Sequence, residues 1–398
     1  MRRTQVTILG AGPVGLVAAY ALARKGVDVT VLEAQSECAA DLRASTLHPP
    51  TLEMLDSLGL LDRLLAQGLK APVYQYRNRR SGQILPFDLT EIADCTAHPY
   101  RLQCEQFKLT RLIVEELKAY PNASVQFQHR AVSFEQDASG VTVFAETPLS
   151  IESVRSDYVI AADGANSIVR KWLNVEFEGF TYPEKFLTIS TATPLENHFK
   201  DLAYVNYVAD AEEWCVLLRV PTLWRVLVPA LETDSDEWLL SDEKKTAVFN
   251  GLVGDGAAVQ TPHRTIYRVH QRVAKQYTHG RILLAGDAAH LNNPLGGLGM
   301  NSGIHDAWNL VDKLSSILLD GEADHPLLAR YERQRRTVMN EIVQAQTINN
   351  KKSIESGLAN QAAFQKQMED LLSDADRRRD YMKRQSLLSS VEREREIA

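Results

Sequence analysis

Short apolar runs that end in glycine or an acidic residue recur along the chain. Residues 5–9 (QVTIL), 28–32 (DVTVL), 158–162 (YVIAA) and 281–285 (RILLA) are too short for helices and are typical of strands buried on both faces. An alanine-rich run, residues 16–23, lies between the first two and is long enough for a helix. This order of strand, helix and strand predicts an α/β fold with a parallel sheet.

A second pattern, in which apolar and polar residues alternate, indicates a different kind of sheet. Residues 203–208, 214–219 and 224–228 alternate as strands with one buried face do, and 71–98 contains shorter strands. We therefore predict a Rossmann-like α/β lobe of residues 1–70, 99–177 and 269–340, interrupted by a β-sheet lobe of residues 71–98 and 178–268. Residues 341–398 are charged and helical in pattern, and we expect a C-terminal helical tail packed across the protein rather than a partner-binding arm.

The turn after the first strand has the spacing of a dinucleotide site. Gly10 suits a tight turn, Gly12 lets the backbone approach a pyrophosphate, and Gly15 lets the following helix pack closely. Glu33 ends the second strand, where its carboxylate favours a free ribose 2′-hydroxyl, as in FAD or NAD. An ordinary strand–helix–strand unit without a ligand does not explain three glycines at these spacings.

A polar turn follows the strand at 158–162. It contains Asp163 and Gly164 and leads to Arg170. A ligand site is one interpretation; a turn in which Asp163 caps the next helix is an equally good one.

The strand at 281–285 leads into Gly286 and Asp287 and then a glycine-rich loop. A carboxylate at this strand end can accept hydrogen bonds from sugar-like hydroxyls. The loop enters a helix through Met300 and Asn301, and the N-terminus of that helix favours negative charge.

In this order and at these separations, the three segments resemble those of the FAD-dependent aromatic hydroxylases typified by p-hydroxybenzoate hydroxylase. The resemblance covers residues 1 to about 340. Arg43 resembles an arginine that lies near the flavin, and Gln106 a glutamine that reaches the ribityl and phosphate region, with Gln103 as a competitor. Val132 resembles the position whose backbone meets the adenine.

This resemblance implies FAD as cofactor and NADH or NADPH as co-substrate. It also implies that the Rossmann-like lobe is the FAD-binding lobe and that the β-sheet lobe binds the substrate. Glu33 would bind the adenosine ribose and Asp287 the flavin ribityl chain, while Asp163 and Arg170 would support the pyrophosphate side and the nicotinamide path. Backbone N–H groups at the start of the last helix would stabilise negative charge on the reduced flavin. The predicted cofactor-binding residues are Gly10, Gly12, Pro13, Val14, Gly15, Glu33, Arg43, Gln106, Val132, Asp163, Arg170, Gly286, Asp287, Gly297, Leu298, Gly299, Met300 and Asn301.

The implied reaction is hydroxylation of an aromatic or N-heteroaromatic substrate with O₂, through a flavin C4a-hydroperoxide from which water must be excluded. Pro294 would line the reaction chamber beside the isoalloxazine. His290 is the other catalytic candidate, although a histidine after this strand more often has a structural hydrogen bond.

Substrate contacts are less defined by the sequence. Arg219 or Arg225 could hold a substrate carboxylate, and Tyr204 and Tyr207 point to opposite faces of one predicted strand. The loop after His290 contains Asn292 and Asn293, where many phenol-type relatives have paired prolines and an aromatic residue. This departure indicates a chamber shaped for a different ring, or a substrate that is not a simple phenol. With the arginine candidates, it makes aromatic or N-heteroaromatic acids the expected substrates.

Composition narrows the class of protein. The 398 residues are 44% hydrophobic and 24% charged, as in a globular enzyme, and a net charge of −7 without a basic stripe argues against a nucleic-acid partner. Four scattered cysteines indicate neither a metal site nor a disulfide framework, which favours the cytoplasm. The glycines and proline of the N-terminal run argue against a signal peptide, and no apolar run is long enough for a membrane span. A homodimer is one option for the assembly.

Three alternatives share the nucleotide lobe. A flavin-dependent halogenase would need a tryptophan motif that is missing, since Trp214 and Trp224 stand alone. An oxidase, reductase or epoxidase of a larger polyketide or isoprenoid substrate would keep the same fold. A non-catalytic flavin-binding redox regulator would have less need of the loop with Pro294 and its glycines. A hydroxylase couples NAD(P)H oxidation to product formation only with its substrate, whereas a regulator shows slow oxidation that no substrate changes.

Overall fold

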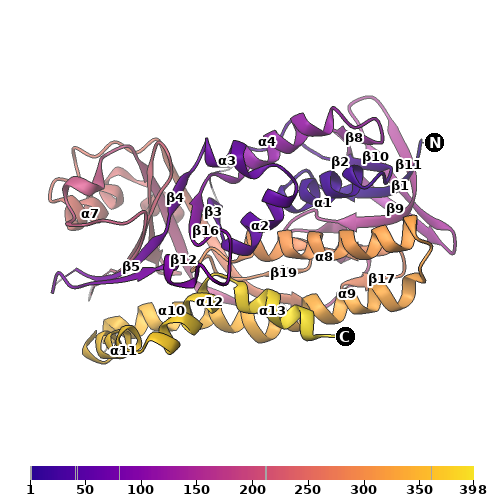
Figure 1. Cartoon of the computed structure of the whole chain (residues 1–398). Coiled ribbons are helices and arrows are strands. Elements are labelled where there is room, and N and C mark those ends of the chain that lie inside the picture. Colours follow the sequence, from indigo (N-terminus) through magenta and orange to yellow (C-terminus); the bar gives the residue numbers. More distant parts are fainter. Residues whose placement is uncertain (1, 41, 43, 80, 211–212, 360) are drawn as a thin grey trace.

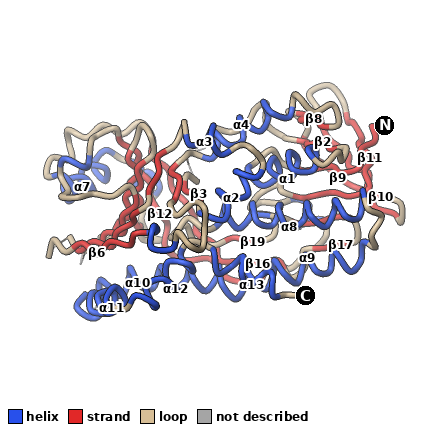
Figure 2. Tube along the Cα trace, viewed as in Figure 1, coloured by secondary structure: helices blue, strands red, loops and turns tan. Residues whose placement is uncertain are grey.

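The computed structural model describes residues 2–40, 42, 44–79, 81–210, 213–359 and 361–398. Two eight-stranded sheets stand side by side in this part of the chain, with helices over both (Figures 1 and 2). The mixed α/β architecture predicted from the apolar runs is confirmed.

The first sheet is built around the predicted buried strands. Its order is β17-β18-β11-β1-β2-β8, and β8, β2, β1, β11 and β18 run parallel. A hairpin of β9 and β10 extends β11. The bounds are β1 (Arg2–Leu9), β2 (Val29–Leu32), β8 (Ala123–Gln126), β9 (Arg130–Asp137), β10 (Gly140–Glu146), β11 (Ile151–Ala161), β17 (Thr278–His279) and β18 (Ile282–Leu284).

Three helices with apolar faces accompany this sheet: α1 (Pro13–Arg24), α4 (Gln106–Leu117) and α8 (Gly299–Leu319). Helix α8 packs closely on α1 and on the Gly286 turn at Gly303. A Cβ at this position would lie 2.7 Å from the Val14 side chain and 3.0 Å from the backbone of Gly286, so only glycine fits without a shift. This contact joins the first turn of the chain to the loop after β18.

The second sheet follows the predicted alternation. Its order is β19-β16-β12-β15-β14-β13-β5-β6. One face packs on α7 through side chains such as Leu217 and Trp224; the other carries Val205, Tyr207 and Leu227. The bounds are β5 (Val73–Asn78), β6 (Ile84–Asp88), β12 (Phe177–Thr191), β13 (Val205–Ala209), β14 (Cys215–Arg219), β15 (Trp224–Ala230), β16 (His263–Ala274), β19 (His290–Leu291), α6 (Asp236–Leu240) and α7 (Asp242–Val253).

A small three-stranded sheet joins the two lobes. Strand β7 (Arg101–Gln103) lies between β3 (Thr46–Leu47) and β4 (Leu69–Ala71). The short helices α2 (Pro49–Ser57) and α3 (Leu61–Leu65) connect β3 to β4, and α5 (Ile168–Trp172) follows β11. This sheet places residues of β7 beside the loops of the first lobe and the strands of the second.

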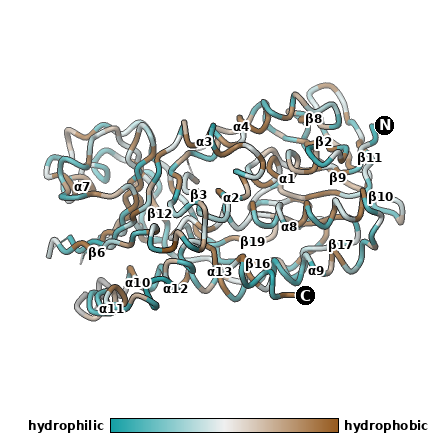
Figure 3. The backbone as a smooth tube through the Cα atoms, viewed as in Figure 1, coloured by the Kyte–Doolittle hydropathy of each residue, from teal (hydrophilic) through white to brown (hydrophobic). Residues whose placement is uncertain are grey.

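The C-terminal segment is helical, as expected, but it is not one helix. After α9 (Asp324–Val338) and a π-helical stretch (Met339–Gln344), the chain forms α10 (Ala345–Ala359), α11 (Gln361–Ser373), α12 (Ala375–Gln385) and α13 (Leu388–Glu396). Asp374 caps α12, and Leu387, with a positive φ of 65°, turns the chain into α13. Apolar and polar segments alternate along these helices (Figure 3), and Met368, Met382 and Leu388 pack against the second sheet.

Candidate active site

The three glycines of the first turn have three different environments. A Cβ on Gly15 would lie 2.1 Å from the carbonyl oxygen of Gly10, and one on Gly10, which has a φ of 102°, would lie 2.5 Å from that of Ala162. Gly12 has no described atom within 4 Å of its Cβ position, and its φ of −76° suits any residue. Gly10 and Gly15 therefore serve the backbone packing, and Gly12 leaves space free in front of helix α1.

Glu33 is fixed at the end of β2 beside this space. Its Oε2 accepts a hydrogen bond from the Ala11 N–H at 2.7 Å, and its Oε1 accepts one from the Gln35 N–H at 2.9 Å. Both bonds orient the carboxylate at the position where dinucleotide folds bind ribose hydroxyls.

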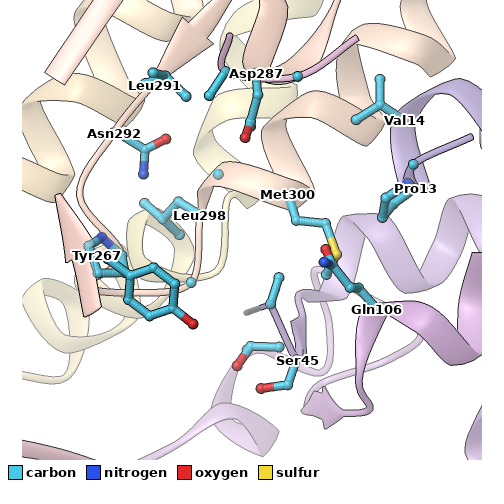
Figure 4. Close-up of a pocket in the computed structure, with 18 of the residues that line it drawn as sticks. Pro13, Val14, Ser45, Gln106, Tyr267, Asp287, Leu291, Asn292, Leu298 and Met300 are labelled. Atoms are coloured by element: carbon cyan, nitrogen blue, oxygen red, sulfur yellow. The ribbon is translucent and has the colours of Figure 1, made fainter. Parts of the chain in front are cut away.

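A cavity of about 500 Å³ begins at this turn and extends between the lobes to the second sheet. In Figure 4, Pro13, Gln106, Met300, Asp287, Ser45 and Tyr267 surround the same space, contributed by segments far apart in the sequence. The predicted residues that line it are Gly12, Pro13, Val14, Glu33, Gln106, Asp287, Pro294, Gly297, Leu298, Gly299, Met300, Tyr207 and Arg225.

The choice of Gln106 over Gln103 agrees with this lining. Gln106 is the first residue of α4 and faces the cavity. Gln103 is fully buried in β7, where its Oε1 accepts a hydrogen bond from the Thr46 hydroxyl at 3.1 Å.

Asp163 and Arg170 lie outside the cavity lining and stabilise the turns that form it. Asp163 Oδ2 accepts hydrogen bonds from the N–H groups of Ile168 and Val169 in the first turn of α5, but the N-cap of this helix is Ser167 and not Asp163. Burial raises the pKa of the Asp163 carboxyl. Arg170 stacks on Phe177 and donates from Nη1 to the Ala288 carbonyl at 2.9 Å. Both side chains support the loops around the cavity, and their predicted role at the pyrophosphate side and the nicotinamide path stays a prediction.

His290 also lies away from the cavity. It is 1% exposed, and its Nε2 is 2.6 Å from Asp306 Oδ2 on helix α8. Asp306 in addition accepts hydrogen bonds from Arg335 Nε at 2.7 Å and from the Gly286 N–H at 3.0 Å. This geometry corrects the catalytic role considered for His290: the ring is part of a buried structural network below the Gly286 turn.

Three other predicted residues are separated from the cavity or undescribed. The Asn301 side chain is buried and bridges two loops, with Nδ2 donating to the Thr46 and Gly297 carbonyls and Oδ1 accepting from the His48 N–H. Val132 lies in β9, 36% exposed, and does not line the cavity. Arg43 lies outside the described residues.

The substrate candidates divide by strand register. Tyr207 and Arg225 line the cavity, and the Arg225 Nη1 donates to the Ser45 hydroxyl at 3.1 Å. Arg219 pairs with Trp224 across the β14–β15 ladder and stacks over its ring, on the face turned away from the cavity. Tyr204 is 40% exposed and also lies outside the lining.

Several residues at the second-lobe end of the cavity could not be identified from the sequence. These include Arg101 from β7, Ser45 before β3, and Tyr267, Arg268 and His270 from β16. No local motif marks them; strand alternation along 263–274 was the available signal for the last three.

The residues present fit FAD. The open space at Gly12 suits a pyrophosphate, Glu33 suits a ribose, and Asp287 extends its carboxylate into the cavity beyond them (Figure 4). The class defined by this fold and site is an α/β flavoprotein whose dinucleotide pocket opens into a β-sheet lobe.

Comparison with known proteins places the chain within a family. Residues 3–346 match the family model described as FAD binding domain. The chain is 32% identical over 338 residues to para-nitrophenol 4-monooxygenase of Pseudomonas sp. (strain WBC-3), covering 84% of this chain and 83% of that protein. It is 33% identical over 362 residues to 6-hydroxy-3-succinoylpyridine 3-monooxygenase HspB of Pseudomonas putida (strain DSM 28022 / S16), covering 88% and 89%.

A solved structure gives the same result. The crystal structure of p-nitrophenol 4-monooxygenase PnpA from Pseudomonas putida DLL-E4 matches with a TM-score of 0.90 and 30% identity, covering 97% of this chain and 99% of that one. The chain therefore belongs to the family of FAD-dependent aromatic hydroxylases, and it is a flavoprotein monooxygenase. The family resemblance drawn from the three motifs is confirmed.

Two further features of the described residues bear on the class of site. None of the described helices is both long and apolar enough to cross a membrane. Within the same part of the chain, no group of three or more histidine, cysteine and acidic side chains is arranged to hold a metal ion.

Asp287 offers a direct test of the cofactor site. We expect Asp287→Ala to weaken FAD binding about 10- to 100-fold, because hydrogen bonds to a carboxylate contribute roughly 1.5–3 kcal/mol. The dissociation constant is measured by titrating flavin-free protein with FAD, with Asp287→Asn as the matched variant that retains one acceptor and loses the charge. Unchanged affinity in the alanine variant would contradict the role assigned to Asp287.

Proposed function

We propose that this protein hydroxylates a single aromatic or N-heteroaromatic ring, with NADH or NADPH as reductant and O₂ as oxidant. The reaction consumes one ring C–H substrate, one O₂, one NAD(P)H and one proton, and gives the hydroxylated ring, water and NAD(P)⁺. The observation that carries the proposal is one continuous cavity, which joins the dinucleotide turn at Gly12 to a chamber at Tyr207.

The relatives of this chain support a substrate with one ring. The names of two relatives refer to one-ring compounds, para-nitrophenol and 6-hydroxy-3-succinoylpyridine.

When bound, FAD supplies the transfer of electrons to O₂, for which side chains have no equivalent. The protein contributes a dry chamber: Val205, Val216, Leu218 and Leu227 form an apolar wall on the second sheet, and Leu291 lies at its edge. Excluding water protects a reactive oxygen species from unproductive decay to H₂O₂.

Hydrogen bonds fix the backbone of the loop between β19 and α8, so that this loop can orient a reacting ring. His48 Nε2 lies 2.8 Å from the Gly296 carbonyl oxygen, and Asn301 Nδ2 donates to the Gly297 carbonyl at 2.7 Å. These bonds fix Pro294 and Leu298 at the cavity wall and aim the N-terminus of the 21-residue helix α8 at the cavity, where it favours negative charge.

The test is NADH and NADPH oxidation by FAD-loaded protein with a panel of phenols and hydroxypyridines, with H₂O₂ measured alongside. We expect one ring class to accelerate oxidation many-fold without an equal yield of peroxide, and to give a hydroxylated product. Full peroxide release with every compound would favour an oxidase. Slow oxidation that no ring compound changes would favour a larger substrate or a redox regulator.

A further inference from the structure

A buried arginine lies at the second-lobe end of the cavity. Arg101 opens strand β7, is 1% exposed and lines the cavity. Its Cζ lies 4.3 Å from the centroid of the Tyr74 ring, which is itself stacked on Phe87 at 5.1 Å. The guanidinium is therefore oriented by an aromatic platform on one face.

Hydrogen bonds within the protein do not account for burying the charge of Arg101. Among the described residues, Arg101 Nε and Nη2 are buried without a hydrogen-bond partner. Elsewhere in this protein, a buried arginine such as Arg335 has carboxylate partners in Asp306 and Glu394. A buried cation without such a partner is costly, so it is retained where an anion completes it.

The surroundings of Arg101 do not supply that anion. The described carboxylates of the cavity wall are Glu33 and Asp287, which lie at the dinucleotide turn and the Gly286 loop. Close to Arg101, burial raises the pKa of Tyr74 and of Tyr76 well above their ordinary value and lowers the pKa of His48 well below its own, so all three are neutral near pH 7. The guanidinium charge of Arg101 is therefore available to bind an anionic ligand.

We propose that Arg101 is a specificity-determining residue that binds an oxyanionic substituent of the aromatic substrate, a carboxylate or a phenolate. The inference rests on the proposed function and names its substrate class. The planar N–H edge of a guanidinium matches the two oxygens of a carboxylate, while Tyr207 and the apolar wall contact the ring. A neutral isostere of the same size leaves the buried charge uncompensated and binds less well.

The experiment measures dissociation constants from flavin spectral changes as FAD-loaded protein is titrated with four probes. 4-Hydroxybenzoate carries the carboxylate and 4-nitrophenol, above its pKa, the phenolate; 4-hydroxybenzamide and 4-methylphenol are the neutral counterparts. In the wild-type protein we expect at least one anionic probe to bind about tenfold or more tightly than its neutral counterpart. The anionic probe that does so identifies the substituent.

Arg101→Met keeps an unbranched side chain that can fill the space of the arginine stem, and it removes the guanidinium and its charge. We expect the favoured anion to bind about 30-fold or more weakly to this variant, with the affinity for the neutral probe and the FAD content unchanged. Arg101→Lys, which keeps the charge but not the planar fork, is expected to lie between. The matched control is Arg219→Met, which removes an arginine on the opposite sheet face and should leave both affinities at the wild-type level.

Equal binding of anionic and neutral probes to the wild-type protein overturns the proposal, even if Arg101→Met does not fold. Loss of FAD from folded Arg101→Met, with an unchanged preference for the anion after reconstitution, also overturns it and assigns Arg101 to the cofactor. Both of these results remain compatible with the proposed hydroxylase function, provided that a neutral ring compound is hydroxylated and that its hydroxylation is coupled to NAD(P)H oxidation. Absence of hydroxylation for every ring compound, with the anion preference intact, instead removes the proposed function.

Discussion

Replacing Gly12 with valine is expected to abolish FAD binding and to leave the apoprotein folded. The backbone at Gly12 has a φ of −76°, which valine accepts, and no described atom lies within 4 Å of the Cβ position. The valine side chain would occupy the space through which a pyrophosphate approaches the N-terminus of α1. We expect FAD affinity to fall by more than about 1000-fold, or roughly 4 kcal/mol.

The measurement is flavin content after purification, followed by titration with FAD and thermal unfolding. Because bound cofactor stabilises the folded state, the variant is compared with flavin-stripped wild-type protein, whose Tm it should match. Gly15→Val is the informative contrast: its Cβ would lie 2.1 Å from the Gly10 carbonyl oxygen, so this variant should lose the fold of the turn as well as FAD. Ala119→Val, at an exposed position in the turn after α4, controls for the substitution itself. Gly12→Val protein that purifies with its full FAD would show that the turn has been misinterpreted.

The parts of the fold that could be predicted from the sequence are those in which residues close in sequence are also close in space. The strand, turn and helix from residue 5 to residue 24 form such a unit, and its three glycines have environments that match their spacing. Strand alternation likewise placed Val205 and Tyr207 on one face of β13, where both line the cavity.

Polar residues at strand ends were harder to assign, because the same residue type serves two purposes there. Asp163 after β11 and Asp287 after β18 occupy similar positions, yet Asp163 accepts hydrogen bonds from the first turn of α5 and Asp287 faces the cavity. The difference depends on side-chain direction, which the sequence pattern does not specify. Arg219 and Arg225 differ for a related reason: the register pairs Arg225 with Leu218, so that both line the cavity, and pairs Arg219 with Trp224 on the other face.

Arg101 could not be predicted because its position depends on long-range pairing. It reaches the cavity through the small sheet in which β7 pairs with β3 and β4, segments that are more than 25 residues away along the chain. The C-terminal helices are a similar case. Their sequence is strongly charged, but ion pairs and a few apolar side chains, such as Met382, attach them to the body of the protein.

Asp306 is expected to be the most costly of the buried polar residues to remove. Its carboxylate accepts hydrogen bonds from Arg335, His290 and the Gly286 N–H, and it connects α8 with α9 and with the Gly286 turn. Asp306→Ala leaves the buried Arg335 cation with Glu394 as its remaining carboxylate and the Gly286 N–H without its acceptor. We expect the free energy of unfolding to fall by about 3–5 kcal/mol, measured by urea denaturation.

Two further variants test whether the lost stability comes from the Asp306 hydrogen bonds or from any substitution in α8. Asp306→Asn keeps the shape, but Arg335 Nε donates to one carboxylate oxygen and the Gly286 N–H to the other, so the amide NH₂ would face a donor in either orientation. A substantial part of the stability should therefore still be lost. Asp312→Ala, at an exposed site on the same helix, should change the free energy of unfolding by less than about 0.5 kcal/mol. A similar loss in Asp312→Ala would mean that α8 is sensitive to substitution in general.

The Asp306 network also predicts how stability depends on pH. Burial raises the pKa of this carboxyl, but the charges of His290 and Arg335 and their hydrogen bonds outweigh burial and lower it to about 2, from an ordinary value of 3.8. Since the folded state holds the proton less tightly than the unfolded state, the contribution of Asp306 is complete above about pH 4 and is lost as the pH falls toward 2. Asp306→Ala should therefore have a shallower decrease of stability between pH 4 and pH 2 than the wild-type protein.

Asp306 also accepts a hydrogen bond from the Gly286 N–H, next to Asp287, so Asp306→Ala should bind FAD more weakly than the wild-type protein at neutral pH. Unchanged FAD affinity would show that the turn keeps its position without this carboxylate.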